Sequence, residues 1–183
     1  MENTYLLLHP SSARYVKLIF DEIHNSDFEV DGVYRIDDWE ETVENVYASS
    51  YKKSSTVKQH VKSQAYINMA LFGEHGLLVL LRKEESYDEL VKSTLNLKFK
   101  IRDFLYAKTN ELITIYIDLN KSIYKGQNSK EANMDKIFLS FIHCPDSINQ
   151  YKQDLQFFCQ KMRGKKLSDL EIDRMIRYQT FLI

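Results

Sequence analysis

The alternation of apolar and polar residues along the chain predicts short strands and amphipathic helices in turn. Residues 5–8, YLLL, form a short apolar run that is typical of a strand. From Ser11 or Ser12 the pattern changes, and residues 16–23 carry apolar side chains at i, i+3, i+4 and i+7. We therefore expect a helix with a serine as its N-cap. Residues 28–36, FEVDGVYRI, alternate as a half-buried second strand does.

The middle of the chain predicts a short helix, a buried strand and a longer helical stretch. Asp37 or Asp38 can cap the short helix, because aspartate side chains accept hydrogen bonds from the first turn. Residues 77–81, LLVLL, are apolar throughout, which favours a strand buried on both faces. Residues 86–110 carry apolar side chains at helical spacing, with an expected break near Asn96.

The last third of the chain predicts two more strands and two helices. Residues 112–118 and 136–142 are extended candidates. A strongly amphipathic helix is expected over 148–162, capped by Asp146 or Ser147, and a further helix within residues 163–183. The order of these elements indicates an α+β fold in which helices cover a face of one largely antiparallel sheet.

Length and composition indicate one globular domain. The 183 residues are enough for a single domain with an appendage, and 44% of them are apolar. Five glycines and two prolines leave little material for long linkers. We expect a domain over residues 1–162 and a C-terminal helical extension over residues 163–183.

Charge and cysteine usage exclude several functional classes. With 25 basic and 26 acidic residues, the net charge of -1 argues against nucleic-acid binding through a broad basic surface. Cys144 and Cys159 are the only cysteines and have no metal-like spacing. The N-terminus does not resemble a secretion signal, and no apolar run approaches the roughly 20 residues that cross a bilayer. We expect a cytoplasmic protein without a membrane segment.

Residues 51–64, YKKSSTVKQHVKSQ, are the most basic stretch, with four lysines, one histidine and no acid. Two interpretations stay open. The stretch is either a solvated loop or helix face, or a docking edge for an anion such as a nucleotide.

His143 is the candidate reactive residue, because residues 141–147, FIHCPDS, place it where a strand ends and a helix begins. A histidine accepts a phosphoryl group only if one ring nitrogen is unprotonated, so the other needs a fixed acceptor for its proton. Ser147, Tyr151 and Asp154 follow on one helical stripe. Asp154 can reach back to the imidazole, and Ser147 can brace Asp154.

The N-terminus of the same helix adds free N–H groups and a positive dipole end where a transferred phosphoryl would develop charge. The alternative is structural. In that interpretation a backbone carbonyl satisfies His143, and Asp154 is a surface acid.

The segment around His143 resembles the active site of nucleoside diphosphate kinases. That family has an aliphatic pair, then His, Gly, Ser, Asp and Ser, and a glutamate eleven residues beyond the histidine, the spacing of Asp154 here. The resemblance implies that His143 is the phosphate-accepting nucleophile and that Asp154 holds its other nitrogen. Ser147 would keep a supporting place.

The resemblance covers roughly residues 4–160 and implies further site residues. Residues 102–110, RDFLYAKTN, are similar to the helix end that supplies an arginine and a threonine to the nucleotide phosphates. Arg102 and Thr109 would make these contacts, and Tyr47 matches a tyrosine near the histidine.

The implied fold is a ferredoxin-like sandwich with a four-stranded, mainly antiparallel sheet covered by helices. The implied chemistry is ping-pong transfer of a terminal phosphoryl between nucleoside di- and triphosphates, with Mg²⁺ on the phosphates. Residues 1–162 would form the kinase-like domain, and a homo-oligomer would be usual.

The sequence also departs from the family. His9 stands where the family has a lysine on the transferred phosphate, and Ser140 stands for its asparagine. Residues 110–142 contain no arginine, although Lys121 or Lys125 can substitute from the loop.

Further departures lie beside the nucleophile and at the base. Cys144 and Pro145 replace a glycine and a serine, and the aromatic platform for the base has no secure counterpart.

These departures leave alternative functions open. Retention of His143 and Asp154 favours a divergent phosphotransferase. Loss of the lysine, the arginine and the base platform favours a catalytically weak or inactive nucleotide-binding or assembly module. The apolar ending YQTFLI and the twelve tyrosines fit a third interpretation, a structural partner-binding protein.

Overall fold

The computed structural model describes residues 2–47, 69, 73, 75–108, 142–161 and 166–178. The expected strand over 112–118, most of that over 136–142 and the basic stretch over 51–64 lie outside these residues.

The described elements are three longer strands, one short strand, a 3-10 helix and five α-helices, in an order typical of an α+β fold. Along the chain they are β1 (Glu2–Leu8), the 3-10 helix η1 (Pro10–Tyr15), α1 (Val16–His24), β2 (Glu29–Ile36), α2 (Trp39–Val46), β3 (Gly76–Lys83), α5 (Tyr87–Lys108), β4 (Ile142–His143), α8 (Ile148–Lys161) and α9 (Asp169–Tyr178).

The four strands form one antiparallel sheet in the order β2-β3-β1-β4. Together with a helix between β1 and β2 and another between β3 and β4, this is the β-α-β-β-α-β arrangement of a ferredoxin-like sandwich. The expected fold class is therefore confirmed. β4 lies at one edge of the sheet and pairs with β1 alone among the described strands.

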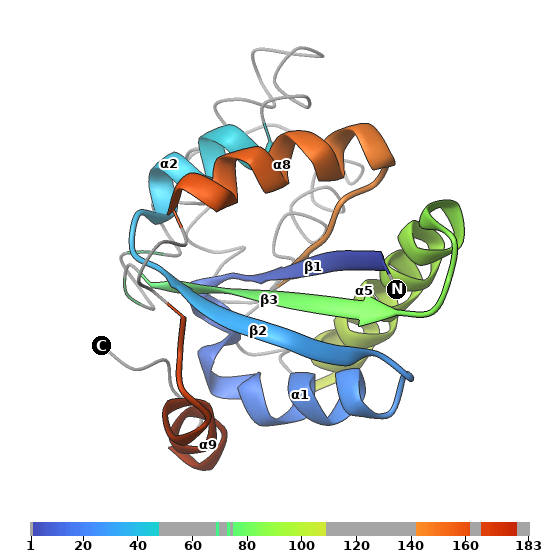
Figure 1. Ribbon diagram of the computed structural model, residues 1–183. Coiled ribbons are helices and arrows are strands. Elements are labelled where there is room, and N and C mark those ends of the chain that lie inside the picture. Colours follow the sequence, from blue (N-terminus) through green and yellow to red (C-terminus); the bar gives the residue numbers. More distant parts are fainter. Residues whose placement is uncertain are drawn as a thin grey trace, which may run out of the picture.

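Helices cover both faces of the sheet, as Figure 1 shows. α1 and α5 lie on one face, and α2 and α8 lie on the other. The alternation of side chains along β1 serves both layers, because successive residues of a strand point to opposite faces. Leu6 and Leu8 pack with α1 and α5, whereas Tyr5 and Leu7 pack with α2 and α8.

α9 closes the core on the α1 side. The amide of Leu167 donates to the carbonyl of Val33 in β2 at 2.8 Å, and Met175 is fully buried in the cluster under α1.

The limits of the domain over 1–162 stay a prediction. Among the described residues, no helix is both long and apolar enough to cross a bilayer.

Two local expectations about helix termini differ from the structure. No serine side chain caps α1; Ser11 and Ser12 are buried in η1, which begins at Pro10, and Tyr15 is the N-cap of α1. Proline suits the first position of a helix because its missing N–H would have no partner there. The break expected near Asn96 is also absent: α5 continues through this residue, whose side chain is exposed.

Two expected caps are confirmed. Asp38 Oδ1 accepts from the amide of Glu41 at 3.1 Å and starts α2. Ser147 Oγ accepts from the amide of Gln150 at 3.2 Å at the start of α8.

The core between the sheet and α8 yields a stability prediction. Phe158 is fully buried and packs edge-on against Tyr5 at 5.2 Å between ring centroids. Phe158→Ala should lower the free energy of unfolding by about 3–5 kcal/mol, because it leaves a cavity in this layer. The matched control is Phe157→Ala, which removes a partly buried ring from the same helix and should cost clearly less.

Urea unfolding measures both variants, with Trp39 as reporter because it is the single tryptophan and lies in the same cluster. Equal losses for the two phenylalanines would contradict the assignment of Phe158 to this core.

Candidate functional site

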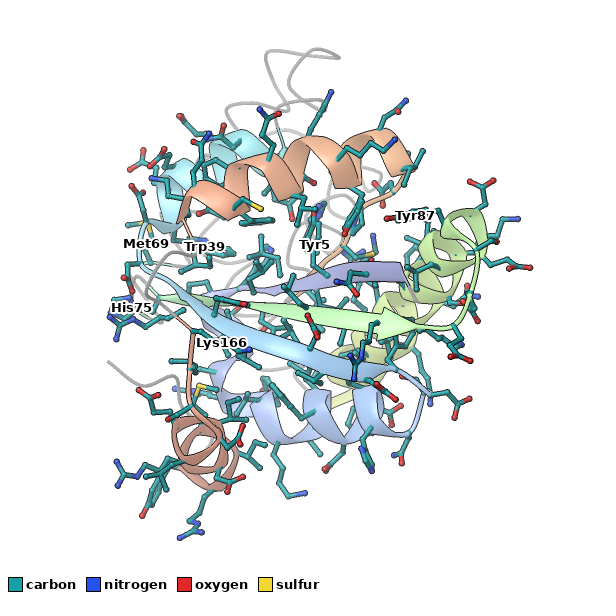
Figure 2. The ribbon with its side chains drawn as sticks, viewed as in Figure 1. Tyr5, Trp39, Met69, His75, Tyr87 and Lys166 are labelled. Carbon is teal, nitrogen blue, oxygen red and sulfur yellow. The ribbon has the colours of Figure 1, made fainter. Side chains whose placement is uncertain are left out.

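The pairing of β4 with β1 positions His143. His143 lies opposite Leu7 in the antiparallel register. Residues directly opposite each other point to the same face, so His143 faces the layer of α2 and α8 together with Tyr5. Its ring centroid lies 4.8 Å from that of Tyr47 and 6.3 Å from that of Tyr5. Figure 2 shows Tyr5 and Trp39 in this layer, between the sheet and the two helices.

His143 is uncharged at neutral pH. The residue is only 4% exposed to solvent. Burial holds the pKa of His143 well below its ordinary value, and the charges of Lys98 and Arg102 lower it further. A neutral imidazole keeps one unprotonated nitrogen, which is the condition for accepting a phosphoryl group.

Gln150 selects the tautomer of this neutral ring. Its Oε1 accepts from the amide of Asp146 at 3.0 Å, and its Nε2 donates to the carbonyl of Val46 at 3.3 Å. These two bonds assign the amide, so the group that faces His143 Nε2 at 3.3 Å is a donor. His143 Nε2 is therefore the acceptor, and the ring proton lies on Nδ1.

Asp154 is buried and faces Tyr5. The hydroxyl of Tyr5 donates to Asp154 Oδ2 at 2.5 Å. Burial raises the pKa of Asp154 and hydrogen bonds from Tyr5 and Gln150 act in the opposite direction, with a resulting pKa of about 6. Gln150 thus contacts both Asp154 and His143, and the two hydrogens of its Nε2 are shared among these groups and the carbonyl of Val46. Direct orientation of His143 by Asp154 stays a prediction.

Ser147 lies on the exposed side of the same turn. Its hydroxyl oxygen accepts the amide hydrogen of Gln150 and so helps to place the residue that contacts His143. The expected brace from Ser147 to Asp154 stays a prediction.

Tyr47 lies beside His143, and His9 lies beside Tyr47. His9 follows β1, is buried, and packs against Trp39 with 4.6 Å between ring centroids. Tyr47 Oη lies 3.3 Å from His9 Nε2. Burial, and to a smaller extent the charge of Arg102, lower the pKa of His9 to about 3. His9 is therefore neutral at pH 7 and supplies no positive charge where the resembled family has a lysine.

Two buried cations come from α5. Arg102 Nη2 donates to the carbonyl of Ile142 at 2.8 Å, and Arg102 Nε is buried without a partner among the described residues. Lys98 is 4% exposed, and its Nζ donates to Asp146 Oδ1 at 3.0 Å. These contacts bring both cations to the strand and turn that carry His143.

Lys98 and Gln150 were missed by sequence reasoning. Lys98 precedes Arg102 by four residues, so both lie on one stripe of α5, among the buried Leu97, Ile101 and Leu105. That spacing is a signal that the sequence carries. Gln150 lies one turn before Asp154, which is a weaker signal because a glutamine at that spacing is common on helix surfaces.

The remaining predicted contacts lie outside the described residues. Thr109, Ser140, Lys121 and Lys125 fall there. Of the phosphate contacts expected from the sequence, the structure brings Arg102, His9 and Tyr47 close to His143.

The described side chains do not fit a magnesium ion held by the protein. Asp146 is engaged by Lys98, and Asp154 is engaged by Tyr5. Within the described ranges there is no group of three or more histidine, cysteine, aspartate or glutamate residues that could bind a metal.

The chain is similar to several solved nucleoside diphosphate kinases. The enzyme of Aquifex aeolicus is 14% identical, with 93% of this chain and 97% of that chain covered and a TM-score of 0.46. The enzyme of Encephalitozoon cuniculi is 13% identical, with 96% and 99% covered and a TM-score of 0.47. That of Borrelia burgdorferi, solved with vanadate and ADP, is 11% identical, with 92% and 94% covered and a TM-score of 0.47.

No family model matches the chain, and no curated protein matches it significantly. The fold assignment rests on the strand order and helix placement described above.

The contact between Gln150 and His143 predicts a tautomer shift. In Gln150→Ala the donor to Nε2 is lost, so the share of the tautomer that carries its proton on Nε2 should rise. The measurement is the ¹⁵N spectrum of histidine-labelled protein, with the His143 signals assigned by their absence in His143→Ala. Asn149→Ala, an exposed change on the same helix, is the control and should leave the spectrum unchanged.

The raised pKa of Asp154 predicts a pH-dependent stability difference. Its folded pKa of about 6 lies above the ordinary value of 3.8, so the folded state binds more protons between these two values. The stability of the wild type should therefore fall relative to that of Asp154→Asn as pH rises from 4 to 7. Urea unfolding at several pH values measures both stabilities. A wild-type stability that stays constant or rises relative to that of Asp154→Asn would contradict the raised pKa.

Proposed function

We propose that the chain is a divergent, nucleoside diphosphate kinase-like phosphotransferase. In this proposal His143 takes the terminal phosphoryl group from a nucleoside triphosphate and passes it to a nucleoside diphosphate. The observation that carries the proposal is a neutral imidazole at the end of β4, beside the buried cations Lys98 and Arg102. The resemblance of residues 141–154 to the family's active-site segment supports the same reaction.

The transfer has two balanced halves. The lone pair of a His143 ring nitrogen attacks the terminal phosphorus, and the bond from that phosphorus to the bridging oxygen breaks. The nucleoside diphosphate leaves with the electron pair. In the second half, a phosphate oxygen of another nucleoside diphosphate attacks the phosphohistidine, and the electron pair returns to the ring nitrogen.

The surrounding groups have roles that follow from charge and position. Arg102 would stabilise the negative charge of the phosphates, since its guanidinium is always protonated. Thr109 and Tyr47 are proposed as further phosphate contacts, and His9 as a neutral one. Asp154 would hold the ring proton of His143, either directly or through a reoriented Gln150.

The proposal requires the site to open. His143 is 4% exposed, and its Nε2 accepts from Gln150 in the structure. Attack through Nε2 therefore needs Gln150 to move away. Attack through Nδ1 needs the ring proton to move to Nε2, where Asp154 or a reoriented Gln150 would accept it.

The same burial favours a second candidate function. A nucleotide-binding or assembly module with weak or absent turnover has no need to expose the histidine, and the Gln150 contact would then be purely structural. The cations on α5 would serve nucleotide binding in both cases.

The proposal extends to the surroundings of the protein. The predicted Mg²⁺ would arrive on the nucleotide phosphates, and no step above is assigned to it. We also propose a cytoplasmic location, a homo-oligomer, and partners that are nucleoside di- and triphosphates rather than nucleic acids or membranes.

Incubation with a nucleoside triphosphate labelled at its terminal phosphate tests the proposal. The wild type should acquire label that is labile in acid and stable in base, as phosphohistidine is. His143→Ala should lose it, whereas His24→Ala, a change at an exposed histidine on α1, should retain it.

Other results separate the alternatives. Label that persists in His143→Ala would overturn the assignment of the nucleophile. Binding of nucleotide by calorimetry without label would favour the module without turnover, and absence of binding would favour a structural partner-binding protein.

A further inference from the structure

We propose that Lys98 is a second phosphate-binding cation of this site and that the carboxylate of Asp146 occupies its anion position until a nucleotide phosphate displaces it. The inference rests on the nucleotide binding in the proposed function, and it does not depend on phosphoryl transfer.

The two cations of α5 bracket the candidate nucleophile. Arg102 bonds to the carbonyl of Ile142, the residue before His143. Lys98 bonds to Asp146, three residues after His143. Because Lys98 and Arg102 are one helical turn apart, a single rigid helix holds both charges at a set spacing along the segment from Ile142 to Asp146.

The charges of the described residues around His143 leave a place for an anion. His9 and His143 are neutral at pH 7, and Asp154 bonds to Tyr5. Arg102 donates to an uncharged carbonyl, and its Nε is buried without a partner among the described residues. Buried charges are normally paired, so an arginine in this state indicates a missing acceptor such as a phosphate oxygen.

Asp146 has the properties of a displaceable partner. Its side chain is 65% exposed, whereas that of Lys98 is 5% exposed. An exposed carboxylate returns to water at little cost, while a buried ammonium group needs an acceptor at all times. A phosphate oxygen offers the same acceptor chemistry as a carboxylate oxygen, so the exchange keeps Lys98 paired.

The backbone of Asp146 is held separately from its side chain. The amide of Asp146 donates to Gln150 Oε1 at 3.0 Å, and that contact does not involve the carboxylate. The carboxylate can therefore rotate away from Lys98 while the turn beside His143 keeps its place.

Lys98 also offers a replacement for the lysine that the resembled family has at the position of His9. His9 is neutral and cannot supply the charge of the expected lysine. Lys98 provides a positive charge from a different element of the fold, on α5 instead of after β1.

Calorimetric binding of a nucleoside diphosphate to the full chain tests the inference. Lys98→Met should weaken binding about tenfold to a hundredfold, the loss expected for a charge-assisted hydrogen bond. Lys98→Arg should restore part of the affinity. The control is Lys100→Met, because Lys100 is exposed on the same helix and pairs with Glu22 at 2.7 Å; it should bind as the wild type does.

Asp146→Asn tests the displaceable partner and keeps Lys98 in place. It should tighten binding about twofold to fivefold, because the phosphate no longer competes with the exposed Asp146 carboxylate for Lys98. This variant also keeps the inference testable if Lys98→Met fails to fold.

Several outcomes would overturn the inference. Equal affinity of Lys98→Met and Lys100→Met would remove Lys98 from the site, and weaker binding by Asp146→Asn would show that its carboxylate helps the nucleotide. Because a nucleoside diphosphate is the probe, these results are independent of whether His143 acquires label.

Discussion

The antiparallel pairing of β4 with β1 is the constraint on which the candidate site depends. It sets His143 opposite Leu7 and thereby decides which layer of the sandwich surrounds the ring. A shift by one residue would turn His143 toward α1 and α5, away from Tyr47 and Gln150. Every contact that governs its protonation and tautomer follows from this register.

Burial and charge act together on that ring. Burial disfavours the protonated form of His143, and the two cations of α5 do so as well, so the imidazole stays neutral well below pH 7. The same cations would attract the phosphates of a nucleotide. The site therefore combines a neutral nucleophile with positive charge, at the cost of a ring that is 4% exposed and engaged by Gln150.

Sequence periodicity predicted the described elements well where one physical signal was dominant. The strands β1, β2 and β3, the cap of α2 at Asp38 and the cap of α8 at Ser147 have clear signals in apolar alternation and capping chemistry. The expectations about Ser11, Ser12 and Asn96 were wrong. Serine and asparagine often begin or end helices, but here Ser11 and Ser12 are buried within η1 and Asn96 is exposed within α5. Pro10 opened η1 instead, and the exposed Asn96 stayed in α5.

By itself the sequence determined the order of strands and helices, the neighbourhood of His143 along the chain, and the spacing of Asp154 behind it. Only the tertiary structure decided that Tyr5 and Gln150 contact Asp154 and that Lys98 and Arg102 reach the turn after β4. The physical reason is distance along the chain. Local patterning acts within a few residues, whereas Tyr5 and Asp154, or Lys98 and Asp146, meet only when the sheet and its two helical layers close on each other.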